Sequence, residues 1–172
     1  MNYELLSFGI ACESSSDKKC QDYYERVKEY FFDEISGNGY MSEKSANVLD
    51  KYKSVKVTKE FMDKYKPSYP MLKHFDIKDN CAAWMDGDKI VGVCSVNKED
   101  DDYGYRWITM IEVTPEYRKQ GVGTALLDYC VKKFHADALG VRKTNKAALS
   151  IYRKYGFHVM WETDRQFKMT LK

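Results

Sequence analysis

The amino-acid sequence predicts a mixed α/β fold (α+β), in which helices flank a central sheet. Short runs rich in β-branched and apolar residues alternate along the chain with segments whose apolar residues recur at helical spacing. A length of 172 residues suits one domain with a substantial core, and 44% hydrophobic and 31% charged residues are ordinary for a globular protein. We therefore expect residues 1–172 to form a single domain.

The first part of the chain predicts one strand followed by three helices. Residues 3–10 have the pattern of a strand, and a stripe of apolar residues predicts a helix over 17–35. Residues 41–53 predict a second, mostly polar helix. Thr58 can cap a third helix, which ends before Pro67. This part of the chain carries no motif that indicates a function.

The second half begins with a predicted hairpin. Two apolar runs, 81–85 and 89–96, flank the tight turn Asp86-Gly87-Asp88, which is typical of a β-hairpin. The acidic residues 99–102 predict a solvated bend, although their charge could also attract a polyamine or an aminoglycoside. The remaining predicted elements are strands over 108–113 and 138–141, a helix that Asn145 precedes, and strands over 157–161 and 166–171.

A strand, a basic loop and the start of a helix follow one another between residues 108 and 123. Apolar residues at helical spacing predict that the helix begins near Gly121. The first amides of a helix lack partners within it and lie at the positive end of its dipole, so a phosphate can bind there. Gly121 and Gly123 carry no Cβ, which lets the backbone approach a pyrophosphate, and Arg118 adds positive charge.

Spacing separates the phosphate-binding motifs that compete for this stretch. A Walker A loop requires Gly-Lys-Ser/Thr, whereas Gly123 is followed directly by Thr124. A dinucleotide-binding fingerprint would have a third glycine where Leu126 stands, so this alternative is weak.

Two motifs resemble the GNAT N-acetyltransferase superfamily. The pattern Arg118-x-x-Gly121-x-Gly123, preceded by Val113-x-Pro115-Glu116-Tyr117, is similar to its acetyl-CoA loop. The stretch 145–157 is similar to the second half of the GNAT core, with Ile151 where leucine is usual. The resemblance covers residues 81–172 as an acetyl-CoA-binding core, and 1–80 would form the variable, acceptor-side half.

The resemblance implies a mixed, mostly antiparallel sheet in which the parallel strands 108–113 and 138–141 splay apart. The pantetheine arm of acetyl-CoA, the cosubstrate, would lie in that gap, where Glu112 and Val113 face it. Asn145 would lie near the arm or the helix start, and it could equally be an ordinary N-cap. The positions that the resemblance assigns to acetyl-CoA are Val113, Arg118, Lys119, Gln120, Gly121, Val122, Gly123, Thr124 and Asn145.

The implied chemistry is direct attack of an amine on the thioester in a ternary complex. Tyr152 has the family's usual position for the acid that assists thiolate departure, and a phenol with a pKa of about 10 is protonated at neutral pH. The alternative is that Tyr152 only packs in the core. Glu112 is the nearest candidate for a base, directly or through a water, although strand alternation could turn it toward other charged groups.

Composition narrows the classes of partner and compartment. The net charge of +2 argues against a strongly basic nucleic-acid binder, and no apolar run is long enough to span a membrane. Five cysteines without metal-binding spacing indicate reduced thiols, a cytoplasmic protein and no metal. The acceptor would be an amine-bearing small molecule or peptide, and a homodimer is left open. Two alternatives also stay open: a CoA-binding module without turnover, serving as a sensor or partner subunit, and an unrelated nucleotide-binding domain.

Overall fold

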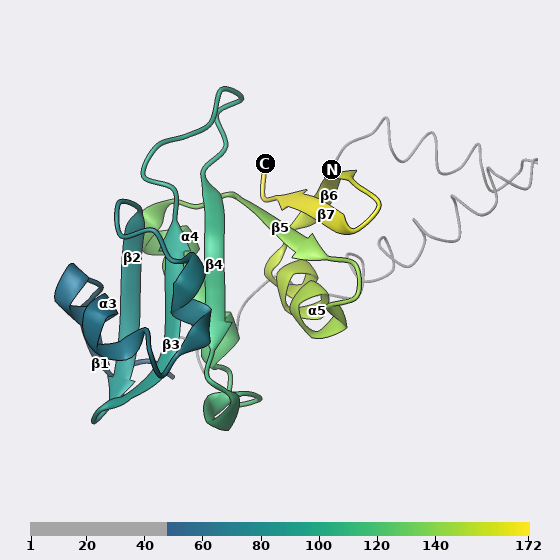
Figure 1. The fold of residues 1–172 in the computed structure, drawn as a ribbon. Coiled ribbons are helices and arrows are strands. Elements are labelled where there is room, and N and C mark those ends of the chain that lie inside the picture. Colours follow the sequence, from purple (N-terminus) through teal and green to yellow (C-terminus); the bar gives the residue numbers. More distant parts are fainter. Residues whose placement is uncertain (1–47) are drawn as a thin grey trace, which may run out of the picture.

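The computed structural model describes residues 48–172 as one mixed sheet with helices on both faces (Figure 1). The strand expected over 3–10 and the helix expected over 17–35 lie outside the described residues. In chain order the elements are β1 (Lys53–Lys56), α3 (Lys59–Tyr65), the 3₁₀ helix η2 (Pro70–His74), β2 (Asn80–Asp86), β3 (Lys89–Val96), β4 (Trp107–Val113), the 3₁₀ helix η3 (Pro115–Tyr117), α4 (Val122–Phe134), β5 (Ala138–Arg142), α5 (Lys146–Tyr155), β6 (His158–Glu162) and β7 (Gln166–Thr170).

The sheet is antiparallel except at one pair of strands. Within residues 48–172 the sheet has seven strands in the order β1-β2-β3-β4-β5-β7-β6, and of these only β4 and β5 run parallel. These two strands pair at Trp107 with Ala138 and at Ile108 with Leu139, and nowhere beyond. The remaining five residues of β4 therefore have no partner on the β5 side. This confirms the expected fold, a mostly antiparallel sheet with a splayed parallel pair.

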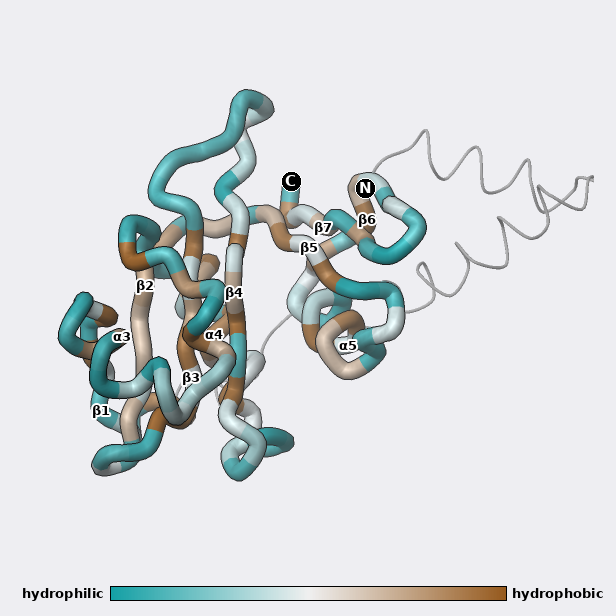
Figure 2. Tube along the Cα trace, in the orientation of Figure 1, coloured by the Kyte–Doolittle hydropathy of each residue, from teal (hydrophilic) through white to brown (hydrophobic). Residues whose placement is uncertain are grey.

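Hydrophobic cores lie on both faces of the sheet. On one face, α4 and α5 pack through a cluster that includes Leu126 and Leu149. On the other face, α3 and η2 pack through Met62 and Leu72. Every residue of β3 after Lys89 is buried because helices cover both of its faces, and Figure 2 shows this strand among the hydrophobic stretches of the chain.

Several predictions are confirmed because they depend on only a few neighbouring residues. The hairpin turns at Gly87, whose φ of 58° is the left-handed conformation that glycine adopts without strain. Thr58 caps α3 by accepting a hydrogen bond from the Phe61 amide at 3.2 Å. The helix expected over 41–53 is wrong in its described part, where a turn over 48–51 leads into β1. Among the described strands, β1 is short and pairs with β2 alone, so its sequence need not alternate clearly.

Gly92 in β3 lets α4 approach the sheet. A Cβ at this position would lie 2.9 Å from Leu126 Cδ1 and 3.1 Å from the Glu112 carbonyl oxygen. The first contact involves a mobile side-chain end, but the second involves the backbone of β4 and cannot relax without moving the strand. A side chain at Gly92 would therefore push α4 or β4 out of place.

We expect Gly92→Ala to lower the free energy of unfolding by about 1–3 kcal/mol, the usual cost of overpacking a dense core. Urea denaturation of the full chain measures the change. Gly123→Ala is the matched control, because a Cβ there would meet its neighbours only at 3.7 Å and beyond. The control should be neutral or stabilising by up to about 1 kcal/mol. Equal destabilisation of the two variants would contradict the close approach at Gly92.

Candidate active site

The loop after β4 presents the amino-terminal end of α4. β4 ends at Val113. The hydroxyl of the next residue, Thr114, donates to the Ile90 carbonyl at 2.5 Å, and Pro115 then begins η3. Gly121 is the N-cap of α4 and has a φ of 83°, a conformation that a side chain would strain. The Ala125 amide makes the first hydrogen bond within the helix, to the Gly121 carbonyl at 3.0 Å. The amides that precede Ala125 are therefore available to an anion, in the direction that the helix dipole favours.

Gly123 has a different role in the geometry from Gly121. Its φ is not in the left-handed region, and it lies in the first turn of α4. A Cβ at Gly123 would lie 3.7 Å from Val113 Cγ2 and 3.8 Å from Ile151 Cδ1. Gly123 therefore faces Val113 at the end of β4 and Ile151 on α5.

Arg118 covers the end of β4. Its Nε donates to the Val113 carbonyl at 3.0 Å, and its Nη2 lies 3.2 Å from Glu112 Oε1. Both side chains of this ion pair are about half exposed, at 55% and 41%. The guanidinium of Arg118 therefore hydrogen-bonds the Val113 carbonyl, which has no partner on β5 because the two strands separate. Behind it, Gln120 closes the loop by donating to the Glu116 carbonyl at 3.0 Å.

Tyr152 lies on α5, packed against the same core as α4. Burial, reinforced by nearby Cys130 and Glu112, raises the pKa of Tyr152 to about 12. The effect of Glu112 means that the two predicted catalytic side chains lie within electrostatic range of each other. Among the described residues, no hydrogen bond engages the Tyr152 hydroxyl, so this protonated phenol has a free donor.

Tyr155, one turn later on α5, is engaged instead. Its hydroxyl donates to Asp128 Oδ1 at 2.9 Å, and Lys132 pairs with the same carboxylate at 2.9 Å. Burial and the bond to Asp128 raise the pKa of Tyr155 strongly. Of the two tyrosines, only Tyr152 offers an uncommitted hydroxyl. Asn145 caps α5 by accepting from the Ala148 amide at 3.2 Å, which confirms the N-cap and leaves its amide nitrogen without a hydrogen bond to the described residues.

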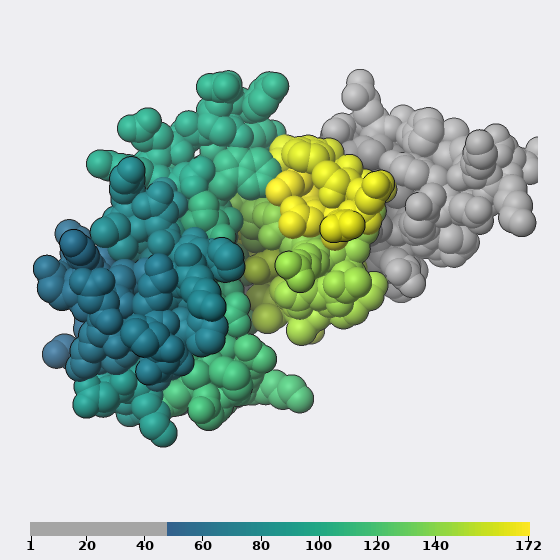
Figure 3. All heavy atoms as spheres, viewed as in Figure 1, coloured from purple at the N-terminus to yellow at the C-terminus, as the bar shows by residue number. Residues whose placement is uncertain are grey.

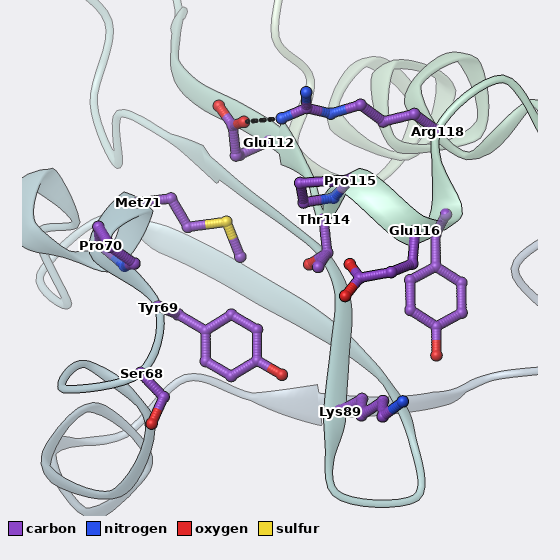
Figure 4. Close-up of a pocket in the computed structure, with 11 residues that line it drawn as sticks. Ser68, Tyr69, Pro70, Met71, Lys89, Glu112, Thr114, Pro115, Glu116 and Arg118 are labelled. Atoms are coloured by element: carbon purple, nitrogen blue, oxygen red, sulfur yellow. Dashed lines mark hydrogen bonds and ion pairs between the residues drawn. The ribbon is translucent and has the colours of Figure 1, made fainter.

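A pocket of about 480 Å³ opens beside Glu112, between the segment before and within η2 and the loop after β4. Figure 4 shows the Tyr69 ring and Met71 directed toward Thr114 and the carboxylate of Glu116 on the opposite wall. The η2 wall is not among the site residues predicted from the sequence; the local signal for it is Tyr69-Pro70, a proline next to an aromatic residue. The lining residues are Ser68, Tyr69, Pro70, Met71, Lys89, Glu112, Thr114, Pro115, Glu116, Tyr117 and Arg118.

The molecule is hollowed on the face that carries this pocket. Figure 3 shows a recess where the teal and green residues meet the lime and yellow residues of 138–172, which we call the C-terminal arm. Within residues 48–172, no three acidic, histidine or cysteine side chains cluster as a metal site would require. None of the helices in that range is long and apolar enough to cross a membrane.

Known proteins resemble this chain in sequence and in fold. Over 87 residues, 49% of its length, the chain is 26% identical to the peptidyl-lysine N-acetyltransferase YiaC of Escherichia coli K12, and the match spans only 56% of that relative. Three solved structures share the fold: the E. coli ribosomal-protein-S18-alanine N-acetyltransferase, a Bacillus subtilis acetyltransferase in complex with CoA, and Arabidopsis thaliana Naa50 with a bisubstrate analogue.

The three structural matches are similar in extent. The S18-alanine enzyme has a TM-score of 0.50 and 18% identity, covering 69% of this chain and 90% of its own. The B. subtilis protein has a TM-score of 0.51 and 19% identity, and the match covers 70% of this chain and 97% of that protein. Naa50 has a TM-score of 0.53 and 18% identity, and the match covers 69% of this chain and 96% of that protein. The family model described as "Acetyltransferase (GNAT) family" matches residues 48–157, well over half of the sequence, and the chain therefore belongs to the GNAT acetyltransferase family.

Proposed function

We propose that this protein is an acetyl-CoA-dependent N-acetyltransferase that acts on a primary amine of a peptide or small molecule. The observation that carries the proposal is the convergence of three features: the splayed end of β4, the open amino terminus of α4 and the free hydroxyl of Tyr152. Relatives named as peptidyl-lysine and protein-alanine N-acetyltransferases support an amine acceptor. The three free cysteines of the described residues support a reducing compartment, the cytoplasm.

Acetyl-CoA would bind as cosubstrate along the splay and across the start of α4. The unpaired amides of Val122, Gly123 and Thr124 would receive the pyrophosphate, and Lys119 and Gln120 would flank it. The pantetheine arm would use the Val113 carbonyl, which Arg118 holds in the free protein. Arg118 would therefore release the Val113 carbonyl on β4 and bind the pyrophosphate instead. Asn145 would lie near the arm while its Oδ1 caps α5.

The acceptor amine would enter from the pocket beside Glu112. This pocket is lined by an aromatic ring, a methionine and a proline on one wall and by carboxylates on the other. The apolar wall accommodates the stem of an amine, and Glu112 and Glu116 offer partners for its positive charge beside the lining cations Lys89 and Arg118. A second pocket, of about 430 Å³ between residues 49–54 and α4, shares no residue with the splay and is less suited to the reaction.

Tyr152 would act as a hydrogen-bond donor to the developing thiolate. A thiol of pKa about 8.5 is a much stronger acid than a phenol whose pKa is raised to about 12, so complete proton transfer to the thiolate is unfavourable. A donated hydrogen bond still stabilises the negative charge as it forms. Glu112 would accept the proton of the attacking amine, directly or through a water, once Arg118 has left it.

A second candidate function is a CoA-binding module without turnover. The specific observation in its favour is that Arg118 engages both Glu112 and Val113, so the free protein holds its base and its arm-binding carbonyl closed. The deciding experiment measures CoA thiol release from acetyl-CoA with a panel of peptides, polyamines and small amines. Acetylation of any of them establishes the enzyme, and tight acetyl-CoA binding without acetylation favours the module.

Gly123→Val should weaken acetyl-CoA binding by at least about tenfold, because its side chain would fill the space between Val113, Ile151 and the pyrophosphate site. Calorimetric titration of the full chain with acetyl-CoA measures the loss. Gly123 is a cleaner probe than Gly121, since replacing Gly121 also strains the backbone at its positive φ. Gly123→Ala serves as the small control. Unchanged affinity in the valine variant, with its fold intact, would refute the assignment of the α4 terminus to acetyl-CoA.

Tyr152→Phe should leave acetyl-CoA binding nearly unchanged and lower kcat by about 10²-fold, the usual scale of such assistance. Because the raised pKa keeps Tyr152 protonated until about pH 12, the ratio of wild-type to variant kcat should stay constant from about pH 6.5 to 9.5. Tyr155→Phe is the control, since that hydroxyl is bound to Asp128. Equal kcat in Tyr152→Phe and wild type would assign Tyr152 to packing alone.

Glu112→Gln should slow acetylation of a lysine side chain more than that of a peptide α-amine at pH 7. A lysine amine, with a pKa of about 10.4, is almost fully charged there, whereas an α-amine near 7.7–8.0 is partly free and needs less help from a base. We expect about a 10²-fold loss of kcat/KM for the lysine acceptor. Glu116→Gln, which changes a second carboxylate on the same wall of this pocket, is the control. Equal losses for both acceptors would argue against Glu112 as the base.

A further inference from the structure

The outer face of the C-terminal arm is the face of the sheet opposite α5. On β7, Phe167 and Met169 belong to the core that α5 covers, so the intervening Lys168 faces the opposite side. Lys168 pairs across the sheet with Gly140 on β5 and with Trp161 on β6. Trp161 is 49% exposed. In the described part of the chain, no helix packs on this face.

Lys168 lies in a slot built by its neighbours. Its Nζ is 5.5 Å from the centre of the Trp107 ring and 5.9 Å from that of Trp161, both within the range of cation–π attraction. The slot exists because Gly140 has no side chain: a Cβ there would lie 2.8 Å from the Lys168 Nζ. Trp107 is itself fixed by the hydrogen bond from its indole Nε1 to Asp101 Oδ2, at 2.6 Å.

No anionic partner neutralises this lysine within residues 48–172. No ion pair or hydrogen bond joins the side chain of Lys168 to another of these residues, and the same holds for the side chains of Arg142 and Arg165. The acidic Glu162 on β6 is already paired with Lys143 at 2.8 Å. The Asp101 carboxylate is engaged by the indole and by the backbone amides of Tyr103 and Tyr105. The face therefore presents an oriented positive charge between aromatic rings, which suits a carboxylate on a partly apolar ligand.

The distance from this slot to the proposed acetyl-transfer site fits an extended peptide. Gly140 is two residues beyond the paired Ala138, so Lys168 is about level with Thr109 on β4, and Glu112 lies three residues further along. Three residues along a strand and two strand spacings across the sheet give roughly 14 Å, more where the strands splay. An extended peptide covers that distance in about four residues.

We propose that this face is a specificity site for a peptide acceptor, in which Lys168, between Trp107 and Trp161, binds an acidic side chain about four residues from the acetylated amine. The proposal rests on the proposed function and names its substrate class. A nucleic acid is the less favoured occupant, because isolated cations and a net charge of +2 fall short of the basic stripe that such ligands require.

The test measures binding apart from turnover. The full chain, saturated with CoA, is titrated with short fluorescently labelled peptides of serine and glycine that have a free amino terminus. One peptide carries glutamate at the fifth residue, a second carries glutamine at the fifth residue, and a third carries glutamate at the second residue. We expect the fifth-position glutamate to tighten binding about tenfold over glutamine at low ionic strength, an effect that salt reduces. The second-position glutamate should gain little, because it cannot reach Lys168.

Two variants probe the slot and one serves as a control. Lys168→Gln should abolish the tenfold preference while leaving affinity for the glutamine peptide unchanged. Gly140→Ala should reduce the preference without altering charge, since its Cβ displaces the ammonium from the slot. Lys56→Gln, an exposed lysine on β1 at the far edge of the sheet, should retain the full preference. Thermal denaturation checks that each variant is folded.

Three results would overturn the proposal: equal affinity for the glutamate and glutamine peptides, a preference that survives Lys168→Gln, or Lys168-dependent binding of oligothymidylate that is tighter than that of the acidic peptide. Failure of the proposed function is visible separately. If small amines are acetylated but no peptide preference exists, only the specificity site is refuted. If acidic peptides bind through Lys168 and nothing is acetylated, the surface is a peptide-binding site on a module without turnover.

Discussion

The separation of β4 from β5 after Ile108 is the constraint on which the rest of the site depends. Backbone groups left without a strand partner need another one, because an unsatisfied amide or carbonyl in a confined space costs free energy. In the free protein the Arg118 side chain supplies a partner for the Val113 carbonyl. A ligand with amide groups, such as a pantetheine arm, could replace it at little net cost. The same separation lets α5 bring Tyr152 close to the end of β4.

Charge on the described chain is distributed around this gap in an ordered way. Carboxylates of Glu112 and Glu116 lie on the pocket side, where a cationic amine would approach. The amino terminus of α4 favours an anion on the other side of the end of β4. Further along the sheet, the C-terminal arm presents Lys168 without an acidic partner. The end of β4 therefore has a carboxylate-lined pocket on one side and an anion-favouring helix terminus on the other.

Hydrogen bonding separates residues that look equivalent by type. Tyr152 and Tyr155 are both partly buried on α5, yet Asp128 binds only Tyr155. Gly121 and Gly123 both belong to the glycine pattern, yet only Gly121 requires a positive φ, and Gly123 instead leaves space beside Val113. The acidic run 99–102 is an ordered bend: Asp100 pairs with Arg106 at 2.7 Å, and Asp101 organises the backbone and Trp107.

The sequence by itself determined the local elements of the second half: the hairpin around Gly87, the strand and loop that lead into a helix beginning at Gly121, and the Asn145 cap. These follow from backbone preferences and spacing within a few residues, which one sequence displays directly. Only the tertiary structure decided that β1 joins the sheet edge, that the η2 segment faces Glu112, that Arg118 folds back on β4, and that Gly140 makes room for Lys168. Each of these is a contact between segments distant in the chain, and packing sets such contacts through shape and burial that no local pattern encodes.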